Sequence, residues 1–191
     1  MKKIMFNDEY ELTKAVFNFR KTQTRRIVSS RDGFIKINFK RVPLSQLFMD
    51  KELRRLSNKI FSCGRYGIGE IVAVAQRYRD ISYKLTSDFS QLPGWTNKMF
   101  VEAYLMPRHI QITNIRLDHL QNISESDCIA EGIRRKVQYG RVLDSFWCPG
   151  LDNSHYISAR EAYADLIDKI CGKGTWNSNP LVFIYDFKLI D

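Results

Sequence analysis

A run of polar residues near the N-terminus holds the side chains best suited to chemistry in this sequence. Residues 20–26 read Arg-Lys-Thr-Gln-Thr-Arg-Arg and place hydroxyl groups among four cations. Arg25 and Arg26 suit a phosphate group, because a guanidinium ion pairs bidentately with phosphate oxygens. Arg20 belongs to the same cationic cluster, so we expect all three arginines to bind phosphate or nucleic acid.

The net charge of the chain lies in the same region. Lysine plus arginine number 30 and aspartate plus glutamate number 21, a formal charge of +9. Residues 1–60 hold 15 basic and 6 acidic residues, a difference of +9, whereas residues 61–191 hold 15 of each. A positive field localised in this way favours RNA, a nucleoside or a nucleotide as the partner. The alternative is a solvated, lysine-rich face without a binding role.

Two further segments extend this predicted interface. Residues 44–61 have the apolar spacing of a helix and carry Arg54, Arg55 and Lys59 between the apolar positions. We expect these three cations to contact a nucleic-acid backbone. Trp176 lies in a stretch rich in glycine and asparagine, where its ring could stack on a base. The alternative for this tryptophan is core packing.

The sequence indicates neither metal ligands nor a membrane segment. Its four cysteines lack the short spacing of a structural zinc site, and its three histidines stand far apart. We therefore expect no metal and no cofactor. No apolar run approaches the roughly 20 residues of a transmembrane helix, and the N-terminus lacks the apolar stretch of a signal peptide. These features predict a cytoplasmic protein without a membrane partner.

Helical and strand patterns follow one another irregularly, which favours one domain over residues 1–191. Helices are expected over residues 8–19 with Asn7 as the N-cap, over 44–61, and after capping boxes that open at Ser124 and Ser158. Strands are expected over residues 1–5, 34–39, 70–75, 99–105, 110–117 and 181–190. The remaining long segments read as loops: residues 80–97, 133–157 and 172–180.

The balance of these elements predicts an α+β fold. Expected strands outnumber expected helices, and the sequence contains neither GxGxxG nor GxxxxGK[ST]. Dinucleotide-binding and P-loop folds are therefore not expected. A mixed, mostly antiparallel sheet or barrel with helices on its outside fits the pattern best.

Several segments, taken in order, resemble the ASCH domain family. They are Arg20–Ile27, Gly67–Val74, Ile112–Leu117, Ser124–Gly132 and Leu181–Phe187. The ending Gly172–Trp176, followed by Asn179-Pro180, is similar to a longer branch of the family associated with phages and prophages. The resemblance covers about half of the chain and implies a PUA-like β-barrel with outer helices. Two insertions, at about 28–66 and 133–157, have no counterpart in the small members of the family.

The resemblance also implies a site. One small bacterial member of the family hydrolyses N4-acylated cytidines, and Lys21, Thr24 and Glu131 match its base, nucleophile and catalytic carboxylate. A threonine hydroxyl needs a base, and lysine can serve only if burial or nearby cations lower its pKa. Residues three apart point to opposite faces of a strand, so Lys21 and Thr24 require a turn before the strand. The family usually has glycine where this chain has Phe19.

Several functions stay open at this point. The first is recognition of RNA or a modified nucleoside, with hydrolysis of an N-acylated nucleoside at Lys21, Thr24 and Glu131. The alternatives are a non-catalytic nucleic-acid-binding module of phage origin, a ribonuclease, or a structural protein of a prophage. A closed pocket that contains the three residues favours an enzyme, and an open basic groove favours a binding module. We expect residues 133–157 to cover the pocket.

Overall fold

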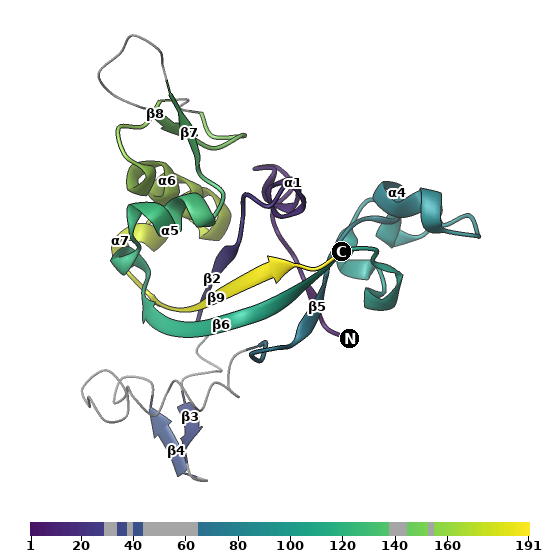
Figure 1. Ribbon diagram of the computed structural model, residues 1–191, viewed down its shortest axis with the longest axis horizontal. Helices are drawn as coiled ribbons and strands as arrows, with labels where there is room; N and C mark the ends of the chain where they lie inside the picture. The colour runs from purple at the N-terminus through teal and green to yellow at the C-terminus, as the bar shows by residue number, and fades with distance from the viewer. Residues whose placement is uncertain (29–33, 38–39, 44–64, 138–144, 153–154) are drawn as a thin grey trace.

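A five-stranded sheet forms the centre of the computed structural model, which describes residues 1–28, 34–37, 40–43, 65–137, 145–152 and 155–191. The strand order is β1-β5-β6-β9-β2 (Figure 1). The strands are β1 (Lys3–Ile4), β5 (Ile71–Val74), β6 (His109–His119), β9 (Leu181–Leu189) and β2 (Gln23–Ile27). Within this sheet β1 and β5 pair in parallel, and the other pairings are antiparallel. The predicted α+β class with a mixed, mostly antiparallel sheet is confirmed.

The long strands β6 and β9 form a bowed ribbon that gives the sheet its curvature (Figure 1). The register between them is irregular between Ile112 and Asn114. An irregularity of this kind bends a strand and increases its twist. β2 extends the sheet beyond β9, with Gln23 opposite Asp186. β2 contains the second half of the cationic cluster, so residues 23–26 are held along the concave ribbon.

The two outer strands of the sheet approach each other through side chains. Nη2 of Arg26, in β2, donates a hydrogen bond of 2.6 Å to the carbonyl oxygen of Met5, just after β1. The Arg26 guanidinium also lies over the ring of Phe6, at 5.8 Å. No strand pairing joins β1 to β2 among the described residues. The described sheet is thus strongly curved but open, and Arg26 spans its seam.

The helices cover the concave side and one end of the sheet (Figure 1). Their bounds are α1 (Leu12–Phe17), α4 (Tyr78–Ile81), α5 (Glu125–Ala130), α6 (Ala159–Cys171) and α7 (Thr175–Ser178). Ser124 and Ser158, the two residues predicted to open capping boxes, are confirmed as N-caps. Oγ of Ser124 accepts from the backbone N–H of Asp127 at 3.1 Å, and Oγ of Ser158 accepts from that of Glu161 at 3.1 Å. These bonds satisfy N–H groups that have no partner within the helix.

The main core lies between the sheet and α6. Buried residues recur along α6 at helical spacing and form one apolar stripe: Ala159, Ala162, Tyr163, Leu166 and Ile167. The sheet contributes buried residues from its central strands: Val72, Ile112, Ile115, Val182 and Ile184. Full burial of a large aliphatic side chain stabilises the fold by about 2 kcal/mol. This core holds α6 over the sheet and thereby fixes the positions of the residues on the buried face of α6, such as Tyr163.

The predicted helix over residues 8–19 begins later than its apolar spacing suggests. Asn7 caps a turn rather than the helix, because its Oδ1 accepts from the backbone N–H of Glu9 at 2.8 Å. The N-cap is Glu11, in a left-handed conformation with φ 51°, and α1 starts at Leu12. The prediction of Asn7 as the helix cap is therefore wrong. An Asx turn competes with helix initiation in this segment.

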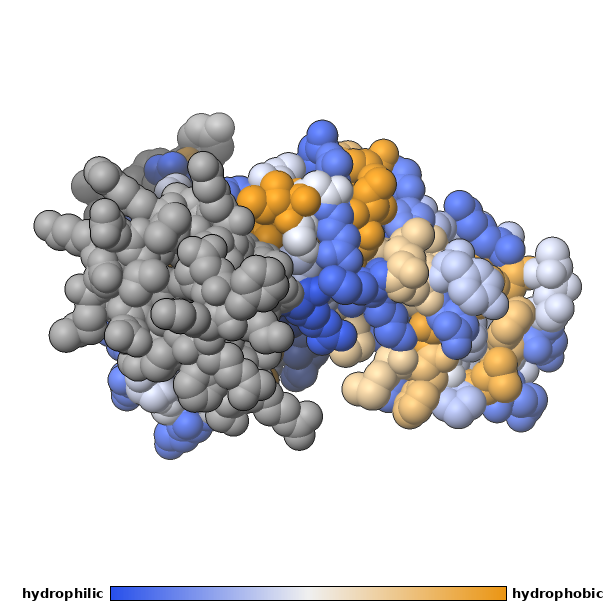
Figure 2. Space-filling view, turned by 90° about the horizontal axis from the view of Figure 1, so that it is seen from below, coloured by the Kyte–Doolittle hydropathy of each residue, from blue (hydrophilic) through white to orange (hydrophobic). Residues whose placement is uncertain are grey.

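A second lobe, residues 77–106, projects from the end of the sheet (Figures 1 and 2). The predicted loop 80–97 contains the end of α4 and 3-10 turns at Ser82–Lys84 and Pro93–Trp95. The predicted strand 99–105 is wrong, because 3-10 turns occupy Lys98–Phe100 and Ala103–Leu105. Nζ of Lys3 binds the carbonyl oxygens of Lys98, Met99 and Val101, which a strand would direct to a neighbouring strand. Figure 2 shows hydrophobic and polar residues interspersed on this lobe.

Two hairpins stand apart from the central sheet. β3 (Phe34–Ile37) confirms the predicted strand and pairs with β4 (Lys40–Pro43). β7 (Arg134–Lys136) pairs with β8 (Ser145–Trp147). The prediction that residues 133–157 form a loop is therefore wrong for these two strands. The predicted helix over residues 44–61 lies outside the described residues. None of the described helices is long and apolar enough to cross a lipid bilayer.

Candidate active site

A short turn carries the chain from α1 into β2 and buries Lys21. The backbone N–H groups of Arg20 and Lys21 both donate to the carbonyl oxygen of Ala15, at 2.9 and 3.0 Å. β2 begins two residues later, at Gln23. Lys21 therefore precedes the strand, and the turn that a Lys21–Thr24 pair requires is present.

Phe19 makes this turn with a left-handed backbone, at φ 57°. A residue with a Cβ pays roughly 1 kcal/mol for this conformation, whereas glycine adopts it freely. The Phe19 side chain is 71% exposed, so little packing offsets the cost. The chain thus has the backbone of a glycine at the position where the ASCH resemblance expects one.

Glu131 reaches Lys21 from the C-terminal end of α5. It is the C-cap residue of this helix, and the next residue, Gly132, has φ 113°. A Cβ on Gly132 would lie 3.1 Å from Cδ2 of Leu12 and 3.8 Å from Cδ of Lys21. Glycine therefore allows the helix to end directly against the lysine stem.

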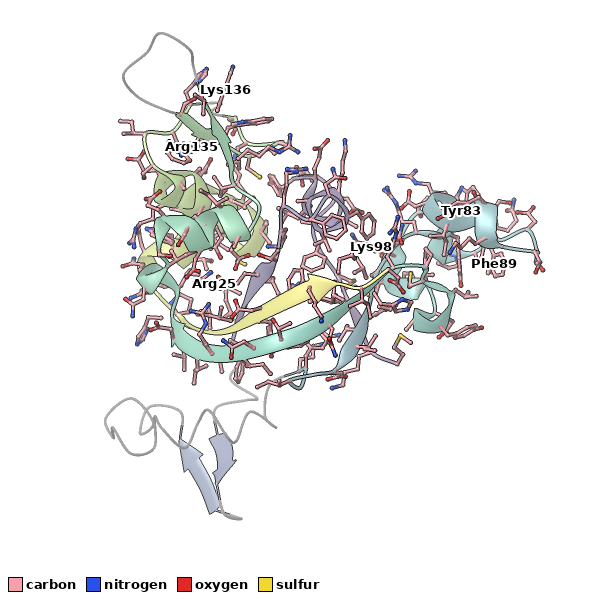
Figure 3. The ribbon with its side chains drawn as sticks, viewed as in Figure 1. Arg25, Tyr83, Phe89, Lys98, Arg135 and Lys136 are labelled. Carbon is pink, nitrogen blue, oxygen red and sulfur yellow. The ribbon has the colours of Figure 1, made fainter. Side chains whose placement is uncertain are left out.

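Lys21 and Glu131 form a buried ion pair. Nζ of Lys21 donates to Oε2 of Glu131 at 2.6 Å and to its carbonyl oxygen at 2.7 Å, with side chains only 2% and 5% exposed. Nη1 of Arg25 donates to the other carboxylate oxygen, Oε1, at 3.2 Å, and its Nη2 donates to Oδ2 of Asp127 at 3.0 Å. Arg25 lies between the sheet and α5 (Figure 3). The four charges alternate, as buried charges must if each is to be compensated.

Burial and neighbouring charges shift the pKa values of three of these residues, Lys21, Arg25 and Asp127. Burial lowers the pKa of Lys21 because the protein interior disfavours an ammonium ion, and nearby Arg26 adds to this, although Glu131 opposes both. Burial alone would lower the pKa of Arg25, but Glu131 and Asp127 hold it above its usual value. Burial alone would raise the pKa of Asp127, but Arg25 holds it below. Of these three residues, Lys21 is therefore the one whose pKa shift favours the neutral form, which a general base requires.

Thr24 and the ion pair line one pocket, of about 480 Å³. Its polar lining includes Lys21, Thr24, Arg25 and Glu131. Its other walls are aromatic rings and the apolar stripe of α6: Phe6, Tyr66, Phe183, Tyr185, Leu166, Ile167 and Ile170. Nζ of Lys21 lies over the Phe6 ring at 5.6 Å. The pocket thus combines a reactive polar region with aromatic walls, which suits a planar ligand with one polar group.

Tyr163 adds an uncompensated hydroxyl to the same pocket. Its side chain is buried, and its hydroxyl oxygen has no hydrogen-bond partner within the described part of the chain. Its ring packs edge-on against Trp176, with centroids 6.3 Å apart. Burial raises the pKa of Tyr163 well above its ordinary value, and Glu131 adds to this. The hydroxyl therefore stays protonated and is a hydrogen-bond donor available to a ligand.

Sequence reasoning missed the residues that hold Arg25 in place. Nε2 of Gln23 donates to Oδ1 of Asp186 at 2.6 Å and to Oδ1 of Asp127 at 3.2 Å, and Oε1 of Gln23 accepts from Arg25. Two spacings could have identified them. Gln23 and Arg25 are two apart in a strand, and Asp127 and Glu131 are four apart at a helix, so each pair shares a face.

The other predicted binding residues lie elsewhere. Arg20 is half-buried beside Arg134 and does not line the pocket, whereas Arg26 does. Trp176 lies in the short helix α7 instead of the predicted loop, packs against the core, and has the Arg160 guanidinium 5.7 Å from its ring. Arg54, Arg55 and Lys59 lie outside the described residues. The described residues of the insertion 133–157 do not line the pocket, so the expected cover finds no support there.

Metal and thiol chemistry have no cluster of residues to support them in the described ranges. No group of three histidine, cysteine, aspartate or glutamate side chains is arranged there to hold a metal ion. Burial raises the pKa of Cys128 to about 12 and that of Cys148 to about 11. Both thiols therefore stay protonated at neutral pH and are poor nucleophiles.

Comparisons of the chain with protein-family models, with curated proteins and with solved structures found no match. The resemblance to ASCH proteins therefore stays a prediction. The geometry of the pocket and the residues that line it are therefore the basis for assigning a function.

Proposed function

We propose that this protein is a hydrolase of the PUA-like ASCH type that removes the acyl group from an N-acylated nucleoside. Thr24 is the nucleophile, Lys21 is the general base, and Glu131 orients Lys21. One observation carries the proposal: Lys21 and Glu131 meet as a buried ion pair in the wall of the pocket that Thr24 also lines. The curved sheet, whose seam Arg26 spans, is consistent with a PUA-like fold.

The hydrogen bonds of Lys21 prepare it for this role. A neutral lysine amine has two N–H groups and one lone pair. Glu131 accepts from Nζ with its carbonyl oxygen and with Oε2. When Lys21 is neutral, both N–H groups are engaged there and the lone pair remains for a proton from Thr24. Nη1 of the buried Arg25 also donates to Oε1 of Glu131, so the carboxylate is held in place against the amine.

The reaction proceeds in two balanced halves. Oγ1 of Thr24 forms a bond to the acyl carbon while its proton passes to Nζ of Lys21, and the C–N bond then breaks as Lys21 returns that proton to the leaving amine. Water next attacks the acyl-threonine ester and gives its proton to Lys21. The bond between Thr24 and the acyl carbon breaks, and Oγ1 regains the proton. The products are a carboxylic acid and the free nucleoside.

The pocket walls favour a nucleobase as the part of the substrate next to the amide. Phe6, Tyr66, Phe183 and Tyr185 supply aromatic surface, and stacking of a base on a ring contributes about 1–3 kcal/mol. A pocket of about 480 Å³ lies in the range that holds a small ligand. The Tyr163 hydroxyl supplies a donor for a carbonyl oxygen or a ring nitrogen of the base.

Release of the acyl group from N4-acetylcytidine tests this proposal. The full-length protein is incubated with N4-acetylcytidine, and cytidine and acetate are quantified by chromatography. A parallel reaction contains single-stranded RNA with and without a divalent metal ion. We expect cytidine to form and RNA to stay intact. RNA cleavage without acyl release would instead favour a ribonuclease, and activity in neither assay would favour the binding module.

The binding module is the second candidate because of the hairpin β7–β8. Arg135 and Lys136 are exposed on β7, at the end of the molecule beyond α6 (Figure 3). The neighbouring Arg134 lies over the ring of Trp147, at 4.7 Å, and pairs with Glu11. A basic hairpin of this kind suits the phosphate backbone of a nucleic acid. It is separate from the pocket, so both activities can be tested independently.

A further inference from the structure

The cations of the pocket fall into two groups. Lys21 and Arg25 are paired with the buried carboxylate of Glu131. Arg26 and Arg65 also line the pocket, but neither guanidinium pairs with a carboxylate among the described residues. Asp127 pairs with Arg25 and supplies the second negative charge, so the first group is compensated. The second group leaves an excess of two positive charges.

Arg26 is held in place and only partly used. Its Nη2 donates to the carbonyl oxygen of Met5, and its guanidinium lies over the Phe6 ring. Its Nε is buried and has no hydrogen-bond partner in the described ranges. A buried donor without a partner costs about 1–3 kcal/mol. A ligand that accepts from this group would recover that cost.

The backbone of Arg65 is anchored at the pocket, while its side chain is exposed. Its N–H donates to the Tyr185 hydroxyl at 3.0 Å, and its carbonyl oxygen accepts from Nζ of Lys2 at 2.7 Å. Its guanidinium lies over the ring of Tyr66, at 5.9 Å. Burial raises the pKa of Tyr66, and Arg65 and Arg26 both oppose this. Both arginines therefore lie near enough to Tyr66 to act on its hydroxyl.

We infer that Arg26 and Arg65 bind the phosphate of the substrate, so that the pocket takes an N-acylated nucleoside monophosphate in preference to the free nucleoside. This inference rests on the proposed function. Two guanidinium groups without carboxylate partners in the described ranges match a phosphate dianion in charge and in hydrogen-bond geometry. Tyr66, whose ring lies against the Arg65 guanidinium, supplies an aromatic surface for the nucleoside. Lys21 is already paired with Glu131, so it does not compete with Arg26 and Arg65 for the phosphate.

Calorimetric titration of the full-length protein with cytidine, cytidine 5′-monophosphate and inorganic phosphate tests the inference without requiring turnover. We expect the monophosphate to bind at least about tenfold more tightly than cytidine. Arg65→Gln should abolish most of this preference, because it removes one of the two positive charges that bind the phosphate. The variant should still fold, because the Arg65 side chain is exposed. Arg26→Gln should do the same and provides a second reading. Arg108→Gln is the matched control, since Arg108 is exposed, lies outside the pocket and carries the same charge.

The outcomes separate this inference from the proposed function. Equal affinity for cytidine and its monophosphate in the wild type would overturn the inference, as would equal effects of Arg65→Gln and Arg108→Gln. Turnover of N4-acetylcytidine and of its 5′-monophosphate is measured in parallel. Turnover of both with one KM would leave the hydrolase intact and remove the phosphate site. Tight, Arg65-dependent binding of the monophosphate without any turnover would do the reverse.

Discussion

Lys21 and Glu131 are 110 positions apart in the chain, yet Nζ of Lys21 lies 2.6 Å from Oε2 of Glu131 in the protein interior. Two local features produce this contact. The turn at Phe19 directs Lys21 inward before β2 begins, and Gly132 lets α5 end against the lysine stem. The contact therefore links the N-terminal cationic cluster to α5, and its energetics and titration can be tested separately from catalysis.

Removal of Glu131 should cost more stability than removal of Lys21. Glu131→Gln leaves the buried cations Lys21 and Arg25 without their shared carboxylate, whereas Lys21→Met leaves Glu131 paired with Arg25. We expect Glu131→Gln to lower the free energy of unfolding by about 3 kcal/mol and Lys21→Met by clearly less. Urea unfolding measures both. The exposed Glu102→Gln serves as a control that stays within about 0.5 kcal/mol of wild type. Equal losses in the two site variants would contradict the pairing described.

The depressed pKa of Lys21 should appear in the pH dependence of stability. The folded-state pKa lies below the ordinary value of 10.5, so between the two values the unfolded chain binds more protons at this residue. The free energy of unfolding therefore rises with pH in this window, and this contribution is lost as pH falls through the folded-state pKa. The difference in stability between wild type and Lys21→Met should grow in favour of wild type from neutral pH toward about pH 10. A difference that shrinks over this range would show a raised pKa.

Local patterns predicted the parts of the fold that local interactions determine. The caps Ser124 and Ser158 depend on bonds to residues three positions away. Strand β9 begins with an apolar run, and β6 has apolar residues spaced between polar ones. The predicted strand 99–105 failed because Lys3, far away in the chain, binds the carbonyl oxygens of that segment. A long-range side chain of this kind leaves no trace in the local spacing.

The candidate site was predictable to a similar degree. The position of Lys21 before β2 follows from the helix-to-strand transition, and the partner Glu131 came from the resemblance to ASCH proteins. Tyr163 carried no signal of its own, because a tyrosine within an apolar helical stripe reads as core. Its hydroxyl, which lacks a hydrogen-bond partner in the part of the chain that the structure describes, is visible only once α6 is packed over the pocket.

Phe19→Gly should stabilise the protein. The substitution relieves the left-handed backbone of Phe19, worth up to about 1 kcal/mol, and removes a side chain that is mostly exposed. The greater entropy of glycine in the unfolded chain offsets part of this gain. Asn18→Gly is the control, because Asn18 has φ −93° and gains nothing from glycine. The midpoint of thermal unfolding is measured for both variants. If Phe19→Gly unfolds at a lower temperature than wild type, as the control Asn18→Gly should, this account of the turn is contradicted.

Tyr163→Phe should separate ligand binding from stability. The Tyr163 hydroxyl is buried without a partner in the described ranges, so its removal should leave stability unchanged or raise it by up to about 1 kcal/mol. The same variant should bind cytidine more weakly. Tyr156→Phe is the control, because the Tyr156 hydroxyl donates to Oδ2 of Asp165 at 2.5 Å and its loss should destabilise the protein. A destabilised Tyr163→Phe with normal cytidine affinity would assign the hydroxyl a structural role instead.

The rate of acyl release by variants of Thr24 and Lys21 tests the central claim most directly. Thr24→Val keeps the side-chain shape and removes the hydroxyl, Thr24→Ser keeps the hydroxyl, and Lys21→Arg keeps the charge but cannot act as a base. With N4-acetylcytidine as substrate, we predict turnover by wild type, reduced turnover by Thr24→Ser, and almost none by Thr24→Val or Lys21→Arg, with each variant folded by circular dichroism. Turnover by Thr24→Val at the wild-type rate, or its absence from wild type, would contradict a hydrolytic site built on Lys21, Thr24 and Glu131.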